Sequence, residues 1–247
     1  MPDPLSRLKE DILKGYDDRT LEDLDQALQD GLRPLEIVNN CLVPAIFEVG
    51  LLWNEGKLYL PDVILSVEAF KMASAPMRES LRNHKDQTIG CVVLGTVHGD
   101  AHDLGKDIVA ALLVAAGFEV KDLGINVATE DFLSAIKEHQ PDILALGAYM
   151  STTVPAMKEV VDAVRGTTLS PGMRVMVGGR AVSKSEAQQM GAEGYGQDAL
   201  EAVDCARKLV GLEENITDFL SRLSKPSLEN LRSKGALTQD TCNSASD

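Results

Sequence analysis

The sequence is poor in basic residues and aromatic residues, and it contains no long uninterrupted apolar run. Its 247 residues carry 24 Lys and Arg against 38 Asp and Glu, which gives a formal net charge of −14. A chain this acidic is not expected to bind nucleic acid or an anionic membrane, because both require a basic face. No apolar run reaches the roughly 18 residues of a membrane span. We therefore expect no nucleic-acid partner and no membrane.

Cysteine is also scarce, and the chain starts with Met-Pro-Asp-Pro, without the basic and apolar segments of a secretory signal peptide. The four cysteines are far apart and form no CxxC or Cys/His zinc pattern; they are Cys41, Cys91, Cys205 and Cys242. We expect reduced thiols, no structural zinc and a cytoplasmic protein.

Residues 1–84 contain only helical patterns. Apolar residues recur every three or four positions, and one helix is expected to begin near Pro34 and another at Pro61. In the second of these, Val63, Val67 and Phe70 lie on one face. The region is predicted to be a bundle of four helices. A polar stretch at residues 83–87 separates it from the rest of the chain.

Residues 88–212 alternate between short apolar runs and amphipathic segments. This alternation predicts a doubly wound parallel sheet of the Rossmann-like or flavodoxin-like α/β class. The expected strands are residues 89–95, 118–123, 143–146 and 174–177, with a weaker one at 193–195. Residues 213–247 are expected to add an amphipathic helix and a polar tail.

The loop after the first expected strand, residues 95–106, holds two His, two Asp and three Gly. Ligands of open α/β sheets bind beyond the carboxyl ends of the strands, so this loop is a candidate site. The GxGxxG pattern of dinucleotide-binding folds is absent. A metal-ligating His102 would be oriented by a carboxylate on its other ring nitrogen, and Asp100 stands two residues before it. The alternative is a polar loop that caps the next helix.

The pattern Asp100-x-His102-x-x-Gly105 resembles the DxHxxG signature of cobalamin-binding domains. The resemblance implies that His102 is the lower axial ligand of the cobalt of a corrinoid, with Asp100 paired to it. It also implies that other residues of the loop contact the cofactor, namely Gly99, Ala101, Asp103 and Gly105.

Three later blocks resemble the same family in the expected order. Residues 146–153 match the block that lines the channel for the nucleotide tail of the corrinoid, residues 177–179 the glycines beside the lower base, and residues 191–199 the block that closes over the tail. The contacts implied are Gly147, Ser151, Thr153, Gly178, Gly179, Gln197, Asp198 and Ala199.

The second block departs from the family pattern, in which Ser is followed two residues later by Leu. Gly147 and Tyr149 occupy these places, so a hydroxyl contact is absent and the tyrosine is expected to fill part of the channel. Thr153 retains the hydroxyl that extends the His–Asp pair in the family. Its alternative role is to cap the helix that begins near Pro155.

Residues 49–63 resemble the cap motif of methionine synthase and of corrinoid methyl-carrier proteins. The resemblance implies that Trp53, Leu60 and Val63 cover the upper face of the corrin, although Trp53 also fits an ordinary core position. It further implies that the helical region swings off the corrin, with residues 83–87 as the hinge.

The family resemblance implies a corrinoid methyl-carrier protein, one subunit of a multi-component methyltransferase system. A substrate:corrinoid methyltransferase would place a methyl group on Co(I). A second methyltransferase would pass it from methyl-Co(III), the resting loaded state, to tetrahydrofolate or coenzyme M. A reductive-activation protein is a further implied partner. The alternatives are the small subunit of an adenosylcobalamin isomerase and a B12-dependent sensor or regulator.

Overall fold

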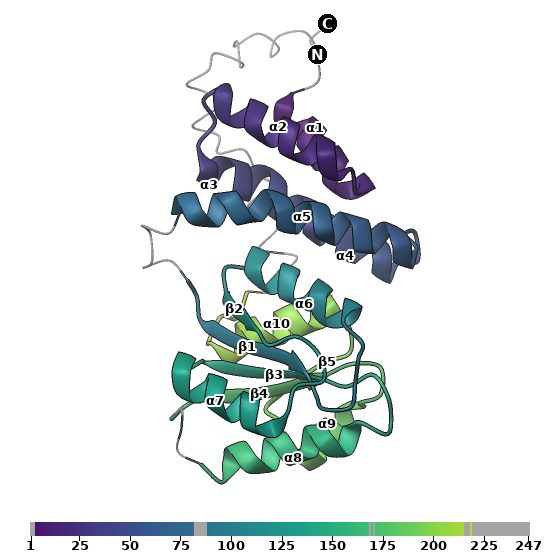
Figure 1. Cartoon of the computed structure of the whole chain (residues 1–247), viewed down its shortest axis with the longest axis vertical. Coiled ribbons are helices and arrows are strands. Elements are labelled where there is room, and N and C mark those ends of the chain that lie inside the picture. Colours follow the sequence, from purple (N-terminus) through teal and green to yellow (C-terminus); the bar gives the residue numbers. More distant parts are fainter. Residues whose placement is uncertain (1–2, 82–87, 168, 170, 215–217, 219–247) are drawn as a thin grey trace, which may run out of the picture.

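The computed structural model describes residues 3–81, 88–167, 169, 171–214 and 218. It has a helical N-terminal region followed by a parallel α/β region, which confirms the predicted fold class (Figure 1). The predicted hinge at residues 83–87 and most of the predicted C-terminal segment lie outside the described residues.

The helical region contains two short helices followed by two long ones. The third predicted helix runs without interruption through Pro34–Asn54 and includes one π-helical turn. Pro44 is the second residue after that turn; because proline lacks an N–H and crowds the preceding turn, the wider turn accommodates it. The elements are α1 (Pro4–Lys14), α2 (Asp17–Gln29), α3 (Pro34–Ile37), η1 (Val38–Leu42), α4 (Val43–Asn54) and α5 (Leu60–Leu81).

The continuous helix Pro34–Asn54 is long and apolar enough to cross a membrane by length and composition alone. Buried helices of soluble proteins meet the same criterion, and half of its apolar segment is buried inside the protein. Ile46, Phe47 and Val49 of this helix are almost completely inaccessible. In this structure it is a core helix.

The α/β region contains a five-stranded sheet whose strands are all parallel, in the order β2-β1-β3-β4-β5. The strands are β1 (Cys91–Thr96), β2 (Glu119–Asp122), β3 (Ile143–Gly147), β4 (Arg174–Gly178) and β5 (Gly194–Gly196). The helices are α6 (Leu104–Ala115), α7 (Thr129–His139), α8 (Val154–Arg165), α9 (Lys184–Met190) and α10 (Ala199–Leu209). The chain runs from β1 outward to β2 and then crosses back to β3 on the other side of β1. The crevice where ligands of such sheets bind therefore lies beyond the carboxyl ends of β1 and β3.

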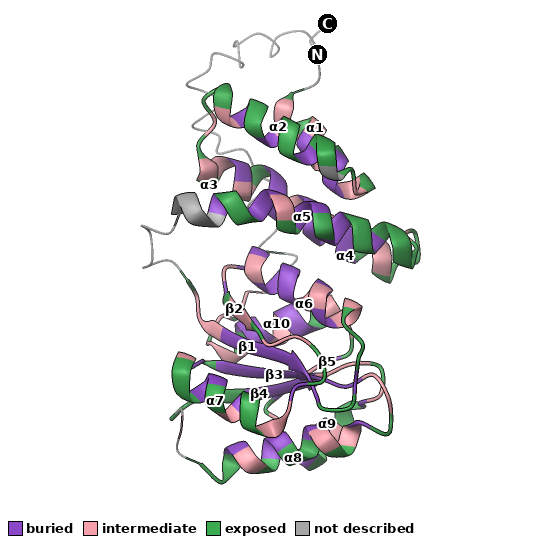
Figure 2. Cartoon of the chain, in the orientation of Figure 1, coloured by how far each residue is buried: buried purple, intermediate pink, exposed green. Residues whose placement is uncertain are grey.

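Helices cover both faces of the sheet, so its central strands β1, β3 and β4 are largely buried, whereas the edge strand β2 is not (Figures 1 and 2). Successive residues of β1 point to opposite faces: Val92 and Leu94 pack towards α6 and α10, and Val93 packs towards α7 and α8. The first of these two cores continues into the helical region.

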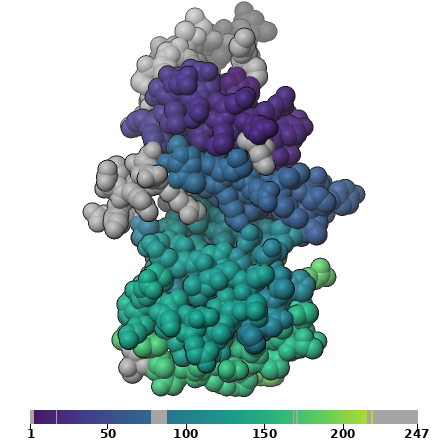
Figure 3. All heavy atoms as spheres, in the orientation of Figure 1, coloured from purple at the N-terminus to yellow at the C-terminus, as the bar shows by residue number. Residues whose placement is uncertain are grey.

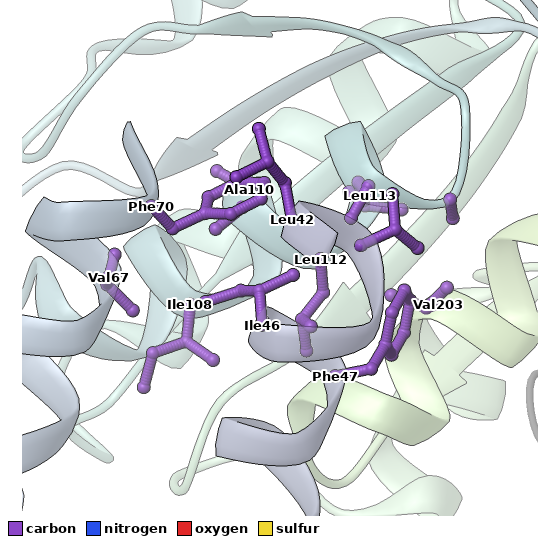
Figure 4. Close-up of a cluster of buried hydrophobic side chains, with 14 of the residues drawn as sticks. Leu42, Ile46, Phe47, Val67, Phe70, Ile108, Ala110, Leu112, Leu113 and Val203 are labelled. Atoms are coloured by element: carbon purple, nitrogen blue, oxygen red, sulfur yellow. The ribbon is translucent and has the colours of Figure 1, made fainter. Parts of the chain in front are cut away.

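The helical region packs on the α/β region through α4, which contacts α6 and α10, and through α5, which contacts α6. Figure 3 shows the blue residues of the helical region against the teal residues of the α/β region. Apolar side chains from both regions point toward one another there (Figure 4), among them Ile46, Phe47, Phe70, Leu112 and Val203. Gly50 permits the close approach, because a Cβ at this position would lie 3.3 Å from the side chain of Leu200. The end of α4 is thereby held near the start of α10.

Candidate functional site

The carboxyl edge of the sheet carries a row of small residues. The strand register aligns Thr96 with Gly147, Gly147 with Gly178, and Gly178 with Gly196. Three adjacent strands therefore end in glycine, and no side chain rises from these positions. The loops that follow β1, β3 and β4 surround this row.

Asp100 and His102 form a tight pair in the loop after β1. His102 Nδ1 lies 2.6 Å from Asp100 Oδ1, and the backbone N–H of His102 donates to the same oxygen at 3.1 Å. Asp100 has no exposed surface, whereas 55% of the His102 side chain is exposed. The imidazole is thus held by Asp100 at Nδ1, while much of the rest of the ring is accessible to a ligand.

The second oxygen of Asp100 is held by the loop after β3. The backbone N–H of Tyr149 donates to Asp100 Oδ2 at 2.7 Å, that of Met150 at 3.3 Å, and the Thr153 hydroxyl at 2.8 Å. Burial opposes the negative charge of Asp100, but these bonds and those from His102 outweigh it and lower the pKa to about 2. Asp100 is therefore a carboxylate at neutral pH.

The charge of Asp100 decides which ring nitrogen of His102 carries the proton. A carboxylate only accepts hydrogen bonds, so Nδ1 is the protonated nitrogen and Nε2 of the neutral ring keeps its lone pair. Within the described residues, Nε2 has no hydrogen-bond partner. His102 can therefore ligate a metal through Nε2 from the exposed side of the loop.

Thr153 immediately precedes α8, but its side chain makes no capping hydrogen bond to that helix. Thr153 is only 5% exposed, and its hydroxyl bonds to Asp100 instead. Of the two roles considered from the sequence, the geometry matches the extension of the His–Asp pair.

Three further residues support the loop, and the sequence patterns did not single them out. Asn126 accepts the N–H of Gly99 at 2.7 Å through its side chain and donates its own N–H to the Asp100 carbonyl at 2.9 Å. Its φ of +53° is uncommon for a residue other than glycine. The Thr96 hydroxyl donates to the His102 carbonyl at 3.0 Å. No residue pattern predicts the role of Asn126, because it depends on how two loops meet.

Lys106, the third, is buried and lies directly after the loop. It pairs with Asp107 at 2.7 Å and with Asp122 at 2.5 Å, and Asp107 also pairs with Lys71 of α5 at 2.5 Å. Although burial disfavours its charge, the two carboxylates raise the pKa of Lys106. The adjacent Lys106 and Asp107 just after Gly105 were the available signal.

The predicted glycine contacts have two different local explanations. A Cβ at Gly179, where φ is +103°, would lie 2.1 Å from the Ala148 carbonyl oxygen, and one at Gly178 would lie 2.8 Å from that of Gly196. The backbone itself therefore requires these two glycines. Gly105 and Gly147 instead face the ring of Tyr149.

The remaining predicted contacts surround the same edge. Asp198 caps α10 by accepting the N–H groups of Leu200 and Glu201, and its Oδ2 accepts a bond from Asn54 of α4 at 3.1 Å. Ala199 is half-buried beside it. Five more of these remaining contacts are exposed: Gly99, Ala101, Asp103, Ser151 and Gln197.

The three cap residues differ in exposure. Trp53 is half-buried against the helical core, and 48% of Leu60 is exposed. Val63 has no exposed surface because it packs in the helical core with Val67 and Phe70. In this arrangement Val63 offers no surface to a corrin, contrary to what the cap motif implied.

The side chains at the site fit a metal ion whose other ligands come from a bound cofactor. Among the described residues, no group of three or more His, Cys, Asp or Glu side chains is placed to hold a metal ion. A single oriented imidazole beside a glycine-lined edge suits the cobalt of a corrinoid, whose macrocycle supplies the equatorial nitrogens. Fold and site together define a cofactor-binding protein of the parallel α/β class.

Comparisons with known proteins identify the family. Residues 5–75 and 90–204 match two models, each described as a B12 binding domain. A corrinoid protein of Desulfitobacterium hafniense (strain Y51) is 35% identical over 210 residues, 84% of this chain and 97% of that protein. Trimethylamine corrinoid protein 2 of Methanosarcina acetivorans is 35% identical over 202 residues, 81% of this chain and 93% of that protein.

A solved structure agrees with these relatives. The methanol:cobalamin methyltransferase complex MtaBC from Methanosarcina barkeri matches with a TM-score of 0.71 and 30% identity, covering 91% of this chain and 86% of that one. The chain belongs to the B12-binding corrinoid proteins of methyltransferase systems, and its cofactor is cobalamin or a related corrinoid.

Proposed function

We propose that this chain shuttles methyl groups between two methyltransferases, and that His102 holds the corrinoid cobalt through Nε2. The Asp100–His102 pair carries the proposal, because it presents an oriented, exposed imidazole at the edge where ligands of such sheets bind. When bound, the corrinoid supplies the cobalt that accepts and releases the methyl group.

The chain's own residues bind and orient. Asp100 fixes the proton on Nδ1 of His102, and Thr153 and the N–H of Tyr149 hold Asp100 in place. Nε2 of His102 cannot carry a proton while it ligates a metal. Loss of the bond to Nε2 would therefore allow the His102–Asp100 pair to take up a proton, and its formation would release one. The glycine row lets the cofactor approach the backbone.

The helical region is proposed to shield the cofactor. Trp53 and Leu60 are the candidates for contact, since both keep exposed surface near the end of α4 that bonds to Asp198. A carrier has to present its cargo to two enzymes, so the helical region has to move between a covering and an open position. Residues 83–87 remain the proposed hinge.

The proposed partners are a substrate:corrinoid methyltransferase, a second methyltransferase acting on tetrahydrofolate or coenzyme M, and a reductive-activation protein. The structural match to a methyltransferase complex supports the first of these. We place the protein in the cytoplasm and its loaded resting form in the methylated state. The names of the relatives favour this role over an isomerase subunit or a sensor.

The test is the absorption spectrum of the protein loaded with methylcobalamin. His102→Gly should change it at neutral pH from the form with an axial nitrogen base to the form without one, while cofactor remains bound. His98→Gly is the matched control, because His98 is exposed in the same loop. An unchanged spectrum in His102→Gly would refute the axial assignment. To test transfer, the methylated protein is mixed with an acceptor methyltransferase; retention of the methyl group would refute the carrier role.

A further inference from the structure

The phenol ring of Tyr149 stands in the crevice at the carboxyl ends of β1 and β3. A Cβ at Gly105 would lie 2.6 Å from both Cε1 and Oη of Tyr149, so one edge of the ring touches the start of α6. A Cβ at Gly147 would lie 3.3 Å from Cε2, on the opposite edge of the ring. The ring therefore spans the space between the two glycines.

The ring also borders the proposed cobalt ligand. The ring centroids of Tyr149 and His102 are 5.6 Å apart, with their planes inclined by 33°. The backbone of Tyr149 is fixed because its N–H donates to Asp100. The ring of Tyr149 therefore borders the space beside His102 that a ligand would enter.

The side chain of Tyr149 is held by packing alone. Among the described residues, its hydroxyl makes no hydrogen bond, and the ring is only half-buried. A ring without a polar anchor can turn out of the crevice while its backbone keeps the bond to Asp100.

Gly147 and Tyr149 depend on each other. A Cβ at residue 147 would crowd the ring at 3.3 Å, closer than ordinary van der Waals contact. The ring reaches its place because residue 147 has no side chain. Compared with the family pattern of Ser and Leu at these two positions, the strand end has no side chain and the following loop carries a larger one.

We propose that Tyr149 is a specificity residue that selects among corrinoids by the size of the group they insert into this crevice. The inference rests on the proposed corrinoid site and goes beyond it. A corrinoid with a full nucleotide tail has to displace the ring from Gly105 and Gly147. A corrinoid without the tail reaches His102 with the ring in place, so Tyr149 lowers the preference for tailed corrinoids.

The experiment compares the dissociation constants of cobalamin and of cobinamide, which lacks the nucleotide tail. Binding is followed by the corrinoid absorption spectrum and by the fluorescence of Trp53, the single tryptophan. Tyr149→Ala should tighten cobalamin binding about tenfold, as expected from removing the cost of displacing a half-buried aromatic ring. Cobinamide binding should stay within about twofold.

Tyr149→Phe is the matched control, because it keeps the ring and removes only the hydroxyl. It should bind both corrinoids as the unaltered chain does. Weaker cobalamin binding in Tyr149→Phe would mean that the hydroxyl contacts the tail and would overturn the proposal. An unchanged cobalamin-to-cobinamide ratio in a folded Tyr149→Ala variant would also overturn it. If the unaltered chain binds neither corrinoid, the proposed function itself fails.

Discussion

Asp100 at the carboxyl edge of the sheet and Asp11 in the helical region are both buried carboxyl groups, but their surroundings are opposite. Asp100 accepts bonds from His102, Tyr149, Met150 and Thr153, and its pKa is lowered to about 2. Asp11 is 6% exposed, and its Oδ2 has no hydrogen-bond partner in the described part of the chain. Desolvation, with the neighbouring Asp23 carboxyl, raises its pKa to about 6.

The contrast shows what each region is built around. Two loops from different strands converge on Asp100 and supply it with donors, so the edge of the sheet is organised to hold a negative charge behind His102. Among the described residues, the helices around Asp11 leave its Oδ2 without a donor and bury the carboxyl group, so folding favours its protonated form. A buried carboxyl group marks a functional site only when its partners are arranged for its charge.

Asp100→Asn is expected to produce the largest loss of stability. The amide keeps the shape but directs its NH₂ group at donors that need an acceptor, which costs about 2–4 kcal/mol in the free energy of unfolding. Urea unfolding of the cofactor-free protein measures it. Asp103→Asn is the control, since Asp103 is exposed in the same loop and should change stability by less than about 0.5 kcal/mol. Equal stabilities for the two variants would mean that Asp100 is not specially held.

Asp11→Asn is expected to act in the opposite direction and to depend on pH. The folded pKa of about 6 lies above the ordinary value of 3.8, so the stabilising contribution of Asp11 is present below pH 3.8 and is lost as the pH rises to about 6. At pH 7 the amide should therefore be more stable than the carboxylate by about 1–3 kcal/mol.

The Asp11 prediction is checked by urea unfolding at pH 4 and pH 7. The gain at pH 7 should shrink towards pH 4, where the folded chain already holds the proton. Asp25→Asn, at an exposed position of α2, should show no such pH-dependent gain. A gain of the same size at both pH values would contradict the assigned pKa.

The fold was predictable because the apolar periodicity of each element matches its burial. Each predicted strand lies within two residues of the observed bounds. Periodicity was also the better guide at Val63: its spacing from Val67 and Phe70 predicts a shared buried face, and all three are at most 2% exposed. The cap motif, which placed Val63 over a corrin, says nothing about side-chain direction.

The candidate site was predictable only in part. The sequence predicted the pairing of Asp100 with His102, because the two residues are only two positions apart in one tight loop. Tyr149 was expected from the sequence to fill part of the channel, but the partners of its ring, Gly105 and His102, lie in a loop that is distant in the sequence. Asn126 likewise acts across two distant loops, and its left-handed backbone has no sequence signature. Contacts of that kind depend on strand order and register, which local patterns do not specify.

Val63→Ala and Leu60→Ala test which residue of the cap motif packs in the core and which lies at the surface. Removing two methyl groups from the fully buried Val63 should lower the free energy of unfolding by about 1–2 kcal/mol. Leu60→Ala should change it by less than about 0.5 kcal/mol, because half of this side chain is exposed. If Leu60 covers the corrin, its variant should instead speed light-driven demethylation of the loaded protein. A faster rate only in Val63→Ala would reverse these assignments.

The smallest expected effect tests the boundary between the two regions, at the ion pair between Lys71 of α5 and Asp107 of α6. Both side chains are partly exposed, and Asp107 keeps Lys106 as a partner when Lys71 is removed. Lys71→Ala should therefore cost only about 0.5 kcal/mol at low salt, and less at about 1 M salt, where screening is strong. Lys57→Ala is the control, because the Lys57–Glu55 pair is confined to the turn after α4. Faster amide hydrogen exchange in α5 of Lys71→Ala alone would show that the pair helps dock the helical region. Equal exchange in both variants would leave the docking to apolar contacts such as Phe70 with α6.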